Sequence, residues 1–533
     1  MSLHIRQKKN SSGSVSIQII DRIDRKYKVV ETIACVKNDT DLEIFLDVAT
    51  KRLVELNCKS YPTLFDEKKE DELTFLELGN RDLIPIGDEL IYGRLFAQLG
   101  CSNLQLDYKR LQMFKNLVIS RLLYPGSKLY LIDYLEYFKK ETIDKNGIYR
   151  FLDTIYQEGL KLQIEKCVFE HTFKKMNNTI TFTFYDVTTL YFESESEDDL
   201  RKIGYSKEGK LARPQIQLGL FTTLQGYPLS FEVYEGNKYE GHTLVDVLKN
   251  FQEKFKLPNK PIVVADRGML NNDNLAYLEN NGYKYILAAK IKNISHELKT
   301  QISNLTFIDN GVIHTLKLTK DIPYSDDRDN KQTLHINQRL VLSYSSQRAK
   351  KDKYNRDKAI ERLEKKMKAS KSITKKDLKL SYYAKYLNFD DSNCNLAFNI
   401  NTNKIQDDSK LDGIKGFITN DFQLSPNEII EHYNNQYDVE RAFRISKTDL
   451  KIRPIYHRLE TRIKAHILIS FVSYAIYKEF ESKMKGNNIT FKFSQKLLRD
   501  IIKHMFALKV NGNFIYLKFD DIQQQVYEAI KKY

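Results

Sequence analysis

Two short runs that each end on an aspartate constrain the fold of this chain most strongly. Residues 261–266, Pro-Ile-Val-Val-Ala-Asp, are apolar up to the closing carboxylate. Such a run is typical of a strand buried on both faces, because a strand with one solvated face alternates polar and apolar residues. The earlier run 181–186, Thr-Phe-Thr-Phe-Tyr-Asp, ends in the same way. We therefore expect a helix-covered sheet in which Asp186 and Asp266 each close a strand.

Further elements are predicted between and after these two runs. In chain order they are strands over 215–222 and 228–234 joined by a turn at Gln225-Gly226, a helix over 243–255, a helix over 272–280 closed by Gly282, and a strand over 283–289. Three antiparallel strands, a helix, a buried strand, a helix and a strand form an α/β layered order. This order resembles the ribonuclease H-like arrangement.

The regions around this order are expected to form separate units. Alternation over 14–19 and a run over 27–33 predict a hairpin, followed by a helix over about 40–56. Helical periodicity then extends from about residue 83 to residue 174. The predicted domains are a hairpin and helix region (1–75), a helical region (76–175), an α/β core (176–290 and 411–458), a β-rich insertion (291–410) and a mostly helical C-terminal region (459–533).

The predicted insertion is polar and interrupts the core before its last strand, 414–419. It contains a charged helix over 348–368, which mixes both signs and is typical of a solvated face. Its strand-like pieces are 305–308, 311–316, 338–344 and 395–400.

The composition indicates a folded, basic protein in a reducing compartment. Apolar residues make up 41%, which excludes a wholly disordered chain. The 85 Lys and Arg against 70 Asp and Glu give a net charge of +15, which fits either a polyanionic partner or a lysine-rich solvated surface. The five cysteines are scattered singly, which fits neither a disulfide framework nor a zinc site.

No membrane segment or signal peptide is predicted. Residues 1–10 are polar and basic, without an apolar stretch. The most apolar stretch, 465–477, is too short to span a bilayer and is predicted to be a buried helix. We expect a cytoplasmic protein.

Asp186 and Asp266 are the first candidate functional residues. Carboxylates that follow neighbouring strands can converge at the carboxyl edge of an α/β sheet, where such sheets place their sites. The alternative is that both aspartates only form turns, as most aspartates at strand ends do.

A third candidate, Glu440, lies on a predicted helix. Ser425-Pro-Asn-Glu428 is a capping box with Pro at the first helical position. One stripe of this helix comprises Ile429, Tyr433, Gln436, Glu440, Phe443 and Lys447, at steps of three and four residues. A carboxylate facing a core is costly unless it is paired or binds a metal. The alternative is a solvent-facing stripe in which Glu440 pairs with Arg444 or Lys447.

These segments resemble a known family, the bacterial insertion-sequence transposases with an Asp-Asp-Glu triad and a Tyr-x2-Arg-x3-Glu-x6-Lys signature. The matching segments are 185–190 (Tyr-Asp-Val-Thr-Thr-Leu), 263–269 (Val-Val-Ala-Asp-Arg-Gly-Met), 433–447, 453–458 and the 204–207 loop. Tyr433, Glu440 and Lys447 match the signature in spacing, whereas Gln436 stands where the family has Arg. The resemblance extends over about 180–466.

The resemblance implies phosphoryl transfer at a two-metal site. Asp186, Asp266 and Glu440 would be the catalytic residues and the ligands of two Mg²⁺ ions, for which Mn²⁺ is expected to substitute. The implied reaction is cleavage at the terminal inverted repeats of an insertion sequence, followed by strand transfer into target DNA.

The resemblance also implies DNA contacts. Tyr433 and Lys447 would contact terminal phosphates, with Gln436 in place of an arginine contact. Arg267 could reach a phosphate or pair with a carboxylate, and the loop bearing Lys207, Lys210 and Arg213 could follow DNA or be a solvated hairpin. The helical region 76–175 would bind the ends, and 459–533 would support dimerisation.

The expected partner is double-stranded DNA, both transposon ends and target, bound by a homodimer or higher multimer that is nucleoid-associated in a bacterium. Two alternatives remain open. The chain could be a catalytically inactive DNA-binding derivative, or a metal-dependent nuclease that cuts without joining.

Overall fold

The computed structural model describes residues 3–11, 13–23, 26–37, 42, 45–46, 48–50, 52–53, 56, 82–139, 141–157, 159–205, 213–309, 313–325, 330–369, 384–390, 397–435, 437–489, 494–510 and 513–531. The chain divides into two compact units. One contains Met1–Ile91, Ile132–Ile143 and Asn487–Tyr533, and the other contains Tyr92–Leu131 and Asp144–Gly486. The C-terminal region 459–533, predicted as one domain, is thus shared between the two units.

The larger unit is built on an eight-stranded mixed sheet in the order β10-β11-β14-β9-β8-β5-β6-β7. Its strands are β5 (Phe182–Tyr191), β6 (Gln215–Thr223), β7 (Pro228–Glu235), β8 (Ile262–Ala265), β9 (Tyr285–Ala288), β10 (His314–Ser325), β11 (Lys331–Tyr344) and β14 (Ile414–Thr419). β5, β8 and β9 are parallel neighbours, and the remaining pairs are antiparallel. The fold is therefore mixed α/β, as the sequence predicts.

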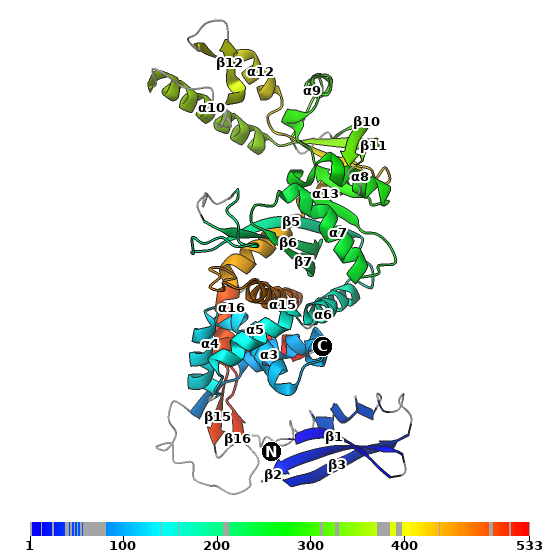
Figure 1. Ribbon diagram of the computed structural model, residues 1–533, viewed down its shortest axis with the longest axis vertical. Helices are drawn as coiled ribbons and strands as arrows, with labels where there is room; N and C mark the ends of the chain where they lie inside the picture. Colours follow the sequence, from blue (N-terminus) through cyan, green and yellow to red (C-terminus); the bar gives the residue numbers. More distant parts are fainter. Residues whose placement is uncertain are drawn as a thin grey trace. The chain divides into compact units, whose positions relative to one another are not determined.

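The helices of this unit lie on the two faces of the sheet and beyond its edges. They are α2 (Arg94–Gln98), α3 (Tyr108–Leu123), α5 (Lys145–Gln157), α6 (Leu160–Lys175), α7 (Thr243–Lys254), α8 (Asn272–Asn280), α9 (His296–Ser303), α10 (Ser346–Ala369), α12 (Thr402–Lys410), α13 (Pro426–Asn434), α14 (Tyr437–Arg444) and α15 (Glu460–Gly486). Figure 1 shows β5, β6 and β7 side by side with α15 below them, in the contact that α15 makes with β7.

One sheet face forms a core with α7 and α8. Tyr185 and Val187 of β5 and Val263 and Ala265 of β8 are buried in this core. Because side chains alternate along a strand, Asp186 and Val264 point to the opposite face. That face is covered by α13, which packs on β8, β9 and β11, and by α14, which packs on β5.

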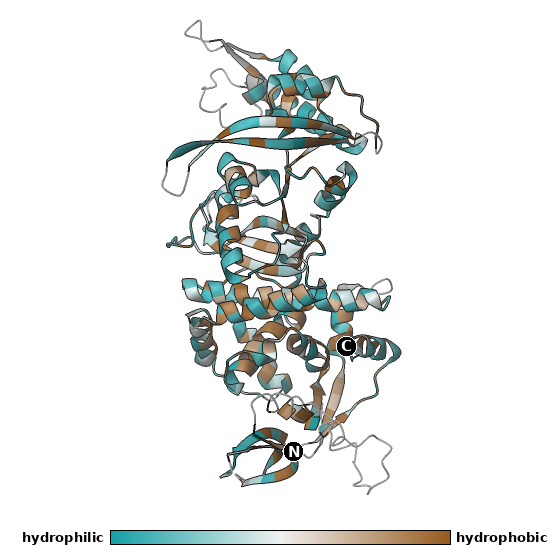
Figure 2. Ribbon diagram, turned by 90° about the vertical axis from the view of Figure 1, so that its right-hand side faces the viewer, coloured by the Kyte–Doolittle hydropathy of each residue, from teal (hydrophilic) through white to brown (hydrophobic). Residues whose placement is uncertain are grey.

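The predicted insertion contributes two strands to the central sheet, so it is not wholly separate from the core. β10 pairs with β11 along their length, and β11 pairs with β14. Of these two long strands, β10 is mostly exposed and much of β11 is buried, and Figure 2 shows teal alternating with brown and white along the ribbon. The charged helix is confirmed as α10, and the remaining strands are β12 (Leu387–Asp390) and β13 (Ala397–Ile400). The piece 305–308 is not a strand.

Within its described residues, the smaller unit contains two three-stranded sheets, one of which includes the predicted hairpin. One comprises β1 (Leu3–Lys9), β2 (Val15–Ile23) and β3 (Lys26–Val36). β1 escaped prediction because it is an edge strand whose charged residues are mostly exposed. The described residues between 42 and 56 are helical, as predicted.

The second sheet adds short strands to a C-terminal region that is otherwise mostly helical, as predicted. β15 (Phe506–Val510) pairs with β16 (Asn513–Tyr516) and with β4 (Leu83–Pro85), which lies more than 400 residues earlier. Such short strands form through distant pairing and carry a weak local signal. The helices of the smaller unit include α16 (Gln495–Lys503) and α17 (Asp521–Lys531). One boundary between the two units in the sequence falls within α4 (Lys128–Tyr134).

The apolar stretch 465–477 is confirmed as a buried helix, within α15. In the part of the chain that the structure describes, no helix combines the length and apolar character that crossing a bilayer requires.

Burial of β9 should dominate the stability of the central sheet. Leu287 is fully buried between β8 and β14. We expect Leu287→Ala to lower the free energy of unfolding by about 2–5 kcal/mol, because it removes apolar contacts and leaves a cavity. Urea unfolding of the full chain measures this. Leu459→Ala is the matched control, since Leu459 is 54% exposed. Equal unfolding midpoints for the two variants would contradict the placement of β9 in the core.

Candidate functional site

Two aspartates lie side by side on neighbouring parallel strands. Tyr185 of β5 is paired in register with Ala265 of β8, so the next residues, Asp186 and Asp266, lie at corresponding positions. Neighbouring strands are about 4.8 Å apart, which brings the two residues close. Both side chains are half-buried and point to the sheet face covered by α13 and α14.

The prediction that Asp186 closes a strand is wrong. β5 continues to Tyr191 because β6 pairs with it along that whole length, and Asp186 itself lies opposite Leu220. Asp266 does follow the last residue of β8, as predicted, and caps a 3₁₀ turn by accepting a hydrogen bond from the Arg267 backbone N–H at 2.7 Å. The two carboxylates are neighbours because of strand register, and only one of them stands at a strand end.

Tyr433 joins this pair from the last turn of α13. Its hydroxyl donates a hydrogen bond to Oδ1 of Asp266 at 3.3 Å. Its ring packs on Phe417 of β14, with ring centroids 4.8 Å apart. Burial, and then the negative charges of Asp266 and Asp186, raise the pKa of Tyr433 far above its usual value. Tyr433 therefore stays protonated and remains a donor to the carboxylate.

The capping box is confirmed, but the single continuous helix after it is not. Ser425 and Glu428 cap α13 reciprocally, as predicted. The helix then ends at Asn434, and α14 starts at Tyr437. The segment after α14 is the π-helical turn η9 (Ile445–Asp449). The predicted stripe is therefore distributed over three short helical pieces, and Gln436 lies outside the described residues.

Glu440 is exposed on α14 and makes no hydrogen bond or ion pair with another described residue. The pairing with Arg444 or Lys447 that the sequence left open is thus not formed. The next residue, Arg441, pairs instead with Glu481 of α15, whose carboxylate is buried. This ion pair anchors α14 against α15. The stripe does not face solvent as a whole, since Ile429 and Phe443 are buried.

The three acidic residues do not form a cluster in this conformation. Among the described residues, no three His, Cys, Asp or Glu side chains come together in a way that could hold a metal ion. Asp186 and Asp266 nevertheless supply the oxygen ligands that Mg²⁺ and Mn²⁺ prefer. The donor chemistry of this pair fits a divalent cation, and a third ligand would have to come from elsewhere.

The predicted DNA contacts have mixed outcomes. Arg267 is exposed beside Asp266, and Lys447 is half-buried in η9. Arg213 pairs with Glu193 at 3.3 Å, so it is engaged with the acidic segment before it. Lys207 and Lys210 lie outside the described residues.

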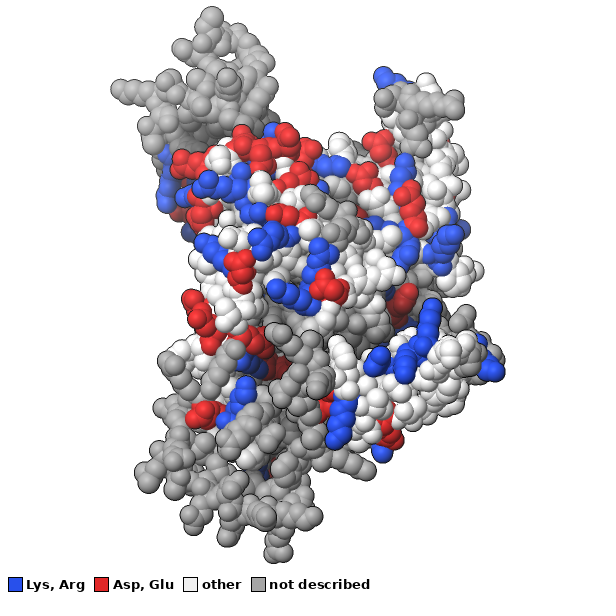
Figure 3. Space-filling view, turned by 60° about the horizontal axis from the view of Figure 1, so that its bottom comes forward, with Lys and Arg blue, Asp and Glu red and all other residues white. Residues whose placement is uncertain are grey.

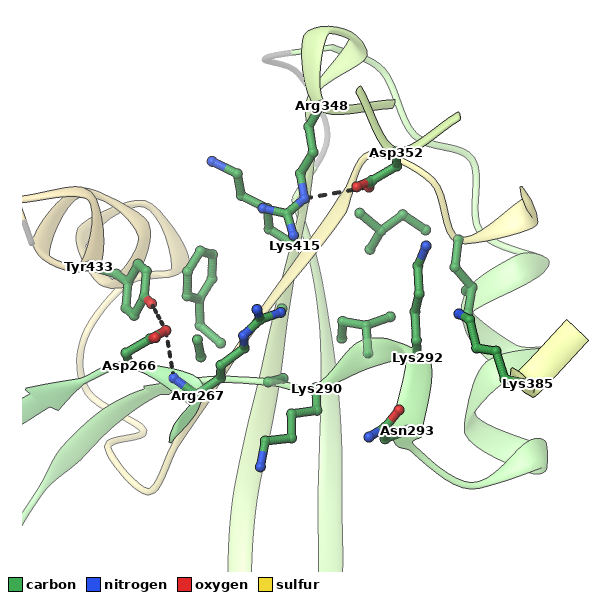
Figure 4. A pocket seen from close by; sticks show the side chains of 17 residues that line it. Asp266, Arg267, Lys290, Lys292, Asn293, Arg348, Asp352, Lys385, Lys415 and Tyr433 are labelled. Atoms are coloured by element: carbon green, nitrogen blue, oxygen red, sulfur yellow. Dashed lines mark hydrogen bonds and ion pairs between the residues drawn. The ribbon is translucent and has the colours of Figure 1, made fainter. Parts of the chain in front are cut away.

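A cavity of about 660 Å³ opens beside Asp266 and Tyr433. Figure 4 shows these two residues at one side of the cavity and Lys292 and Lys385 at the other. Sequence reasoning missed its lysines, of which Lys290 follows β9 and Lys415 lies at the start of β14. The available signal was their position at the ends of strands neighbouring the one that leads to Asp266.

The net charge of +15 does not form one continuous patch on the face in Figure 3. Lys and Arg side chains are interspersed there with Asp and Glu. A basic composition alone therefore does not locate a polyanion site, and local groupings such as this cavity carry more information.

Residues 177–476 match the family described as Transposase DDE domain. This match spans more than half of the chain, so the chain belongs to this family of DDE-type transposases. No curated protein matches it. Among solved structures, the piggyBac transposase synaptic complex with hairpin DNA is similar at a TM-score of 0.37 and 8% identity, over 79% of each chain.

A buried cationic network holds the segment after η9. Nδ1 of His466 accepts hydrogen bonds from Lys128 at 2.9 Å and from Arg121 at 3.1 Å. Its Nε2–H donates to the Ile452 carbonyl at 2.8 Å, and Arg121 also donates to the Lys451 carbonyl at 3.1 Å. Arg121, Lys128 and His466 are all buried. This network fixes the backbone that follows Lys447.

Two histidines of this region are held neutral. Burial, and then the charges of Lys128 and Arg121, lower the pKa of His457 to about 3. The same causes lower the pKa of His466, and the two rings are 5.6 Å apart. Arg462 also opposes protonation of His457, whereas Asp153 favours it.

This arrangement predicts a loss of stability in mild acid. In the unfolded chain, His457 becomes protonated below pH about 6.5, whereas in the folded protein it stays neutral down to pH about 3. The unfolded state thus gains protons, and the free energy of unfolding falls by about 1.4 kcal/mol per pH unit for such a histidine. We expect His457→Asn to reduce this slope between pH 6 and 4, measured by urea unfolding. The exposed control His296→Asn should leave the slope unchanged, and equal slopes for both variants would contradict the mechanism.

Proposed function

We propose that this chain is a transposase of the bacterial insertion-sequence kind, which cleaves the terminal inverted repeats of its element and joins them to target DNA. The observation that carries the proposal is the in-register pair of Asp186 and Asp266 on parallel strands, within the segment that matches the transposase family. The order of elements from β5 to β9 is three antiparallel strands, a helix, a buried strand, a helix and a strand. This order supports a ribonuclease H-like core.

Asp186 and Asp266 are proposed to hold divalent cations, Mg²⁺ by preference and Mn²⁺ as a substitute. Two bound ions would activate the attacking oxygen and stabilise the leaving oxygen of a phosphodiester. The protein residues orient this site. The Tyr433 hydroxyl holds one oxygen of Asp266, which leaves the other oxygen to face a cation.

Glu440 is proposed as the third acidic ligand once DNA is bound. It is exposed and uncommitted, and it follows the interruption between α13 and α14, where a change of backbone conformation would redirect it. The spacing of Tyr433, Glu440 and Lys447 supports this assignment. Because Arg441 is tied to buried Glu481, such a change has to preserve or replace that ion pair.

The remaining proposed contacts are to DNA phosphates, as part of a homodimer or larger assembly. They are Tyr433, Gln436, Lys447, Arg267, Lys207, Lys210 and Arg213. The positive net charge and the exposed guanidinium of Arg267 beside Asp266 support binding of a polyanion near the acidic pair.

Loss of either aspartate should abolish the reaction. We expect Asp186→Asn and Asp266→Asn to lower Mg²⁺-dependent cleavage by a factor on the order of 10³ or more, because each removes a charged metal ligand. The measurement uses labelled DNA that carries the terminal repeats of the element, and it scores cut and joined products separately. Excess EDTA should stop the wild-type reaction.

Asp407→Asn is the matched control, because Asp407 is exposed on α12 and pairs with Lys410. Full activity in either aspartate variant would remove that residue from the site. Cut products without joined products would favour the nuclease alternative, and DNA binding without cleavage would favour an inactive derivative.

Glu440→Gln should separate catalysis from stability. Because Glu440 is exposed, we expect the unfolding free energy to stay within about 0.5 kcal/mol of wild type. Cleavage should fall on the order of 10²-fold or more, because the third carboxylate is lost. Glu431→Gln, an exposed change on α13, should retain activity. An active Glu440→Gln enzyme would leave the two aspartates as the whole acidic site.

A further inference from the structure

Three cationic residues lie at the ends of neighbouring strands of the central sheet: Arg267 just after β8, Lys290 just after β9 and Lys415 at the start of β14. Phe417 of β14 is paired in register with Ala288 of β9, and the Ala289 N–H donates to the Gly416 carbonyl at 2.8 Å. Continuing this antiparallel register places Lys415 opposite Lys290. Arg267 follows β8, the next strand in the sheet, directly after Asp266. The acidic pair on β5 and β8 is thus continued along the same edge by positive charge.

These three residues line the cavity beside Asp266, which we call the lysine groove (Arg267, Lys290 and Lys415, with Lys292, Arg348 and Lys385). Six cationic side chains and two carboxylates, Asp266 and Asp352, line it together with apolar residues such as Ile291 and Phe417. Figure 4 shows the cations distributed across the cavity, with Lys415 and Arg348 above Lys290. A volume of about 660 Å³ exceeds what one small anion fills, because such volumes hold whole organic ligands.

Half of the cations in the lysine groove are committed to neighbouring carboxylates. Lys385 pairs with Asp408 at 2.6 Å. Lys292 and Arg348 make looser pairs at 3.6 Å, with Asp412 and Asp352. Within the described part of the chain, the side chains of Arg267, Lys290 and Lys415 have no such partner. The uncommitted charges are therefore the three that form the row along the sheet edge.

Lys415 also carries a sign of unbalanced positive charge. Burial, and then the nearby Arg348 guanidinium, lower the pKa of its ammonium group. Two cations that face one cavity repel each other, and an anion bound between them would relieve this.

We propose that the lysine groove binds the phosphodiester backbone of DNA, with Arg267, Lys290 and Lys415 as phosphate contacts beside Asp266. Two strand spacings make the row about 10 Å long, which corresponds to about three nucleotides of one DNA strand at 3.4 Å each. A row of point charges fits a chain of phosphates better than a single phosphate group. This inference rests on the proposed function and adds Lys290 and Lys415, which the sequence motifs did not include.

The test is salt-dependent DNA binding by the full chain in EDTA, where cleavage does not occur. The probes are a labelled 30-base-pair duplex of random sequence and a labelled 30-nucleotide oligothymidylate, since phosphate contacts are independent of sequence. Each lysine that neutralises a phosphate releases a counterion, which makes the association constant K depend on salt. Lys290→Ala and Lys415→Ala should therefore each reduce the magnitude of the slope of log K against log salt concentration by about 0.9 for duplex or 0.7 for single strand. At 0.1 M salt the duplex Kd should rise about 8-fold per lysine and about 60-fold in the double variant.

Lys256→Ala is the matched control, because Lys256 is exposed outside the lysine groove. Lys415→Arg should keep the wild-type slope, since it retains the charge, and an unchanged melting temperature would show that the double variant is folded. The probe with the larger change identifies the form of DNA in the groove.

Wild-type slopes in the folded double variant, for both probes, would overturn the groove proposal. So would an effect on thymidine monophosphate binding without an effect on DNA. The two proposals fail separately. If DNA binding depends on the lysine groove but no cleavage occurs, the proposed function is wrong. If cleavage depends on the two aspartates but the double lysine variant binds and cleaves DNA like wild type, only the groove proposal is wrong.

Discussion

The parallel pairing of β5 with β8 is the constraint on which the site depends. It places Asp186 and Asp266 one strand spacing apart on the same sheet face. Two carboxylates at that separation repel each other, so the arrangement persists only because neighbouring groups compensate. Hydrogen bonds from the Val187 and Arg267 backbone N–H groups and from the Tyr433 hydroxyl supply part of that compensation.

The helices above the sheet decide what the pair of aspartates can do. α13 is fixed by its capping box and by Tyr433, whose ring lies on Phe417 and whose hydroxyl reaches Asp266. α14 is fixed separately, by the ion pair from Arg441 to buried Glu481. Because the two helices are anchored independently, the contact of Tyr433 with Asp266 does not bring Glu440 toward the aspartates. In the proposed function, Glu440 joins the two aspartates only when DNA is bound, so the free protein lacks the complete acidic site.

Charge is organised along the same sheet edge. Negative residues follow β8 and lie within β5, whereas Lys290 follows β9 and Lys415 lies at the start of β14. A substrate with a phosphate backbone could therefore be held on one side of Asp266 while its reacting phosphate faces the acidic pair. Buried apolar residues of β8 and β9, such as Val264 and Leu287, keep the acidic and the basic positions in fixed register.

Local patterns determined a large part of this protein. The apolar run before Asp266, the capping box at Ser425 and the apolar stretch within α15 each predicted an element correctly, because burial and capping act over a few residues. Tertiary structure alone decided that β5 runs past Asp186, that β10 and β11 join the central sheet and that α13 stops before Glu440. It also decided that Arg121, Lys128 and His466 meet in one buried network. These features depend on partners distant in sequence, such as β6, β14 and Glu481, and no local periodicity records which distant partner a segment will meet.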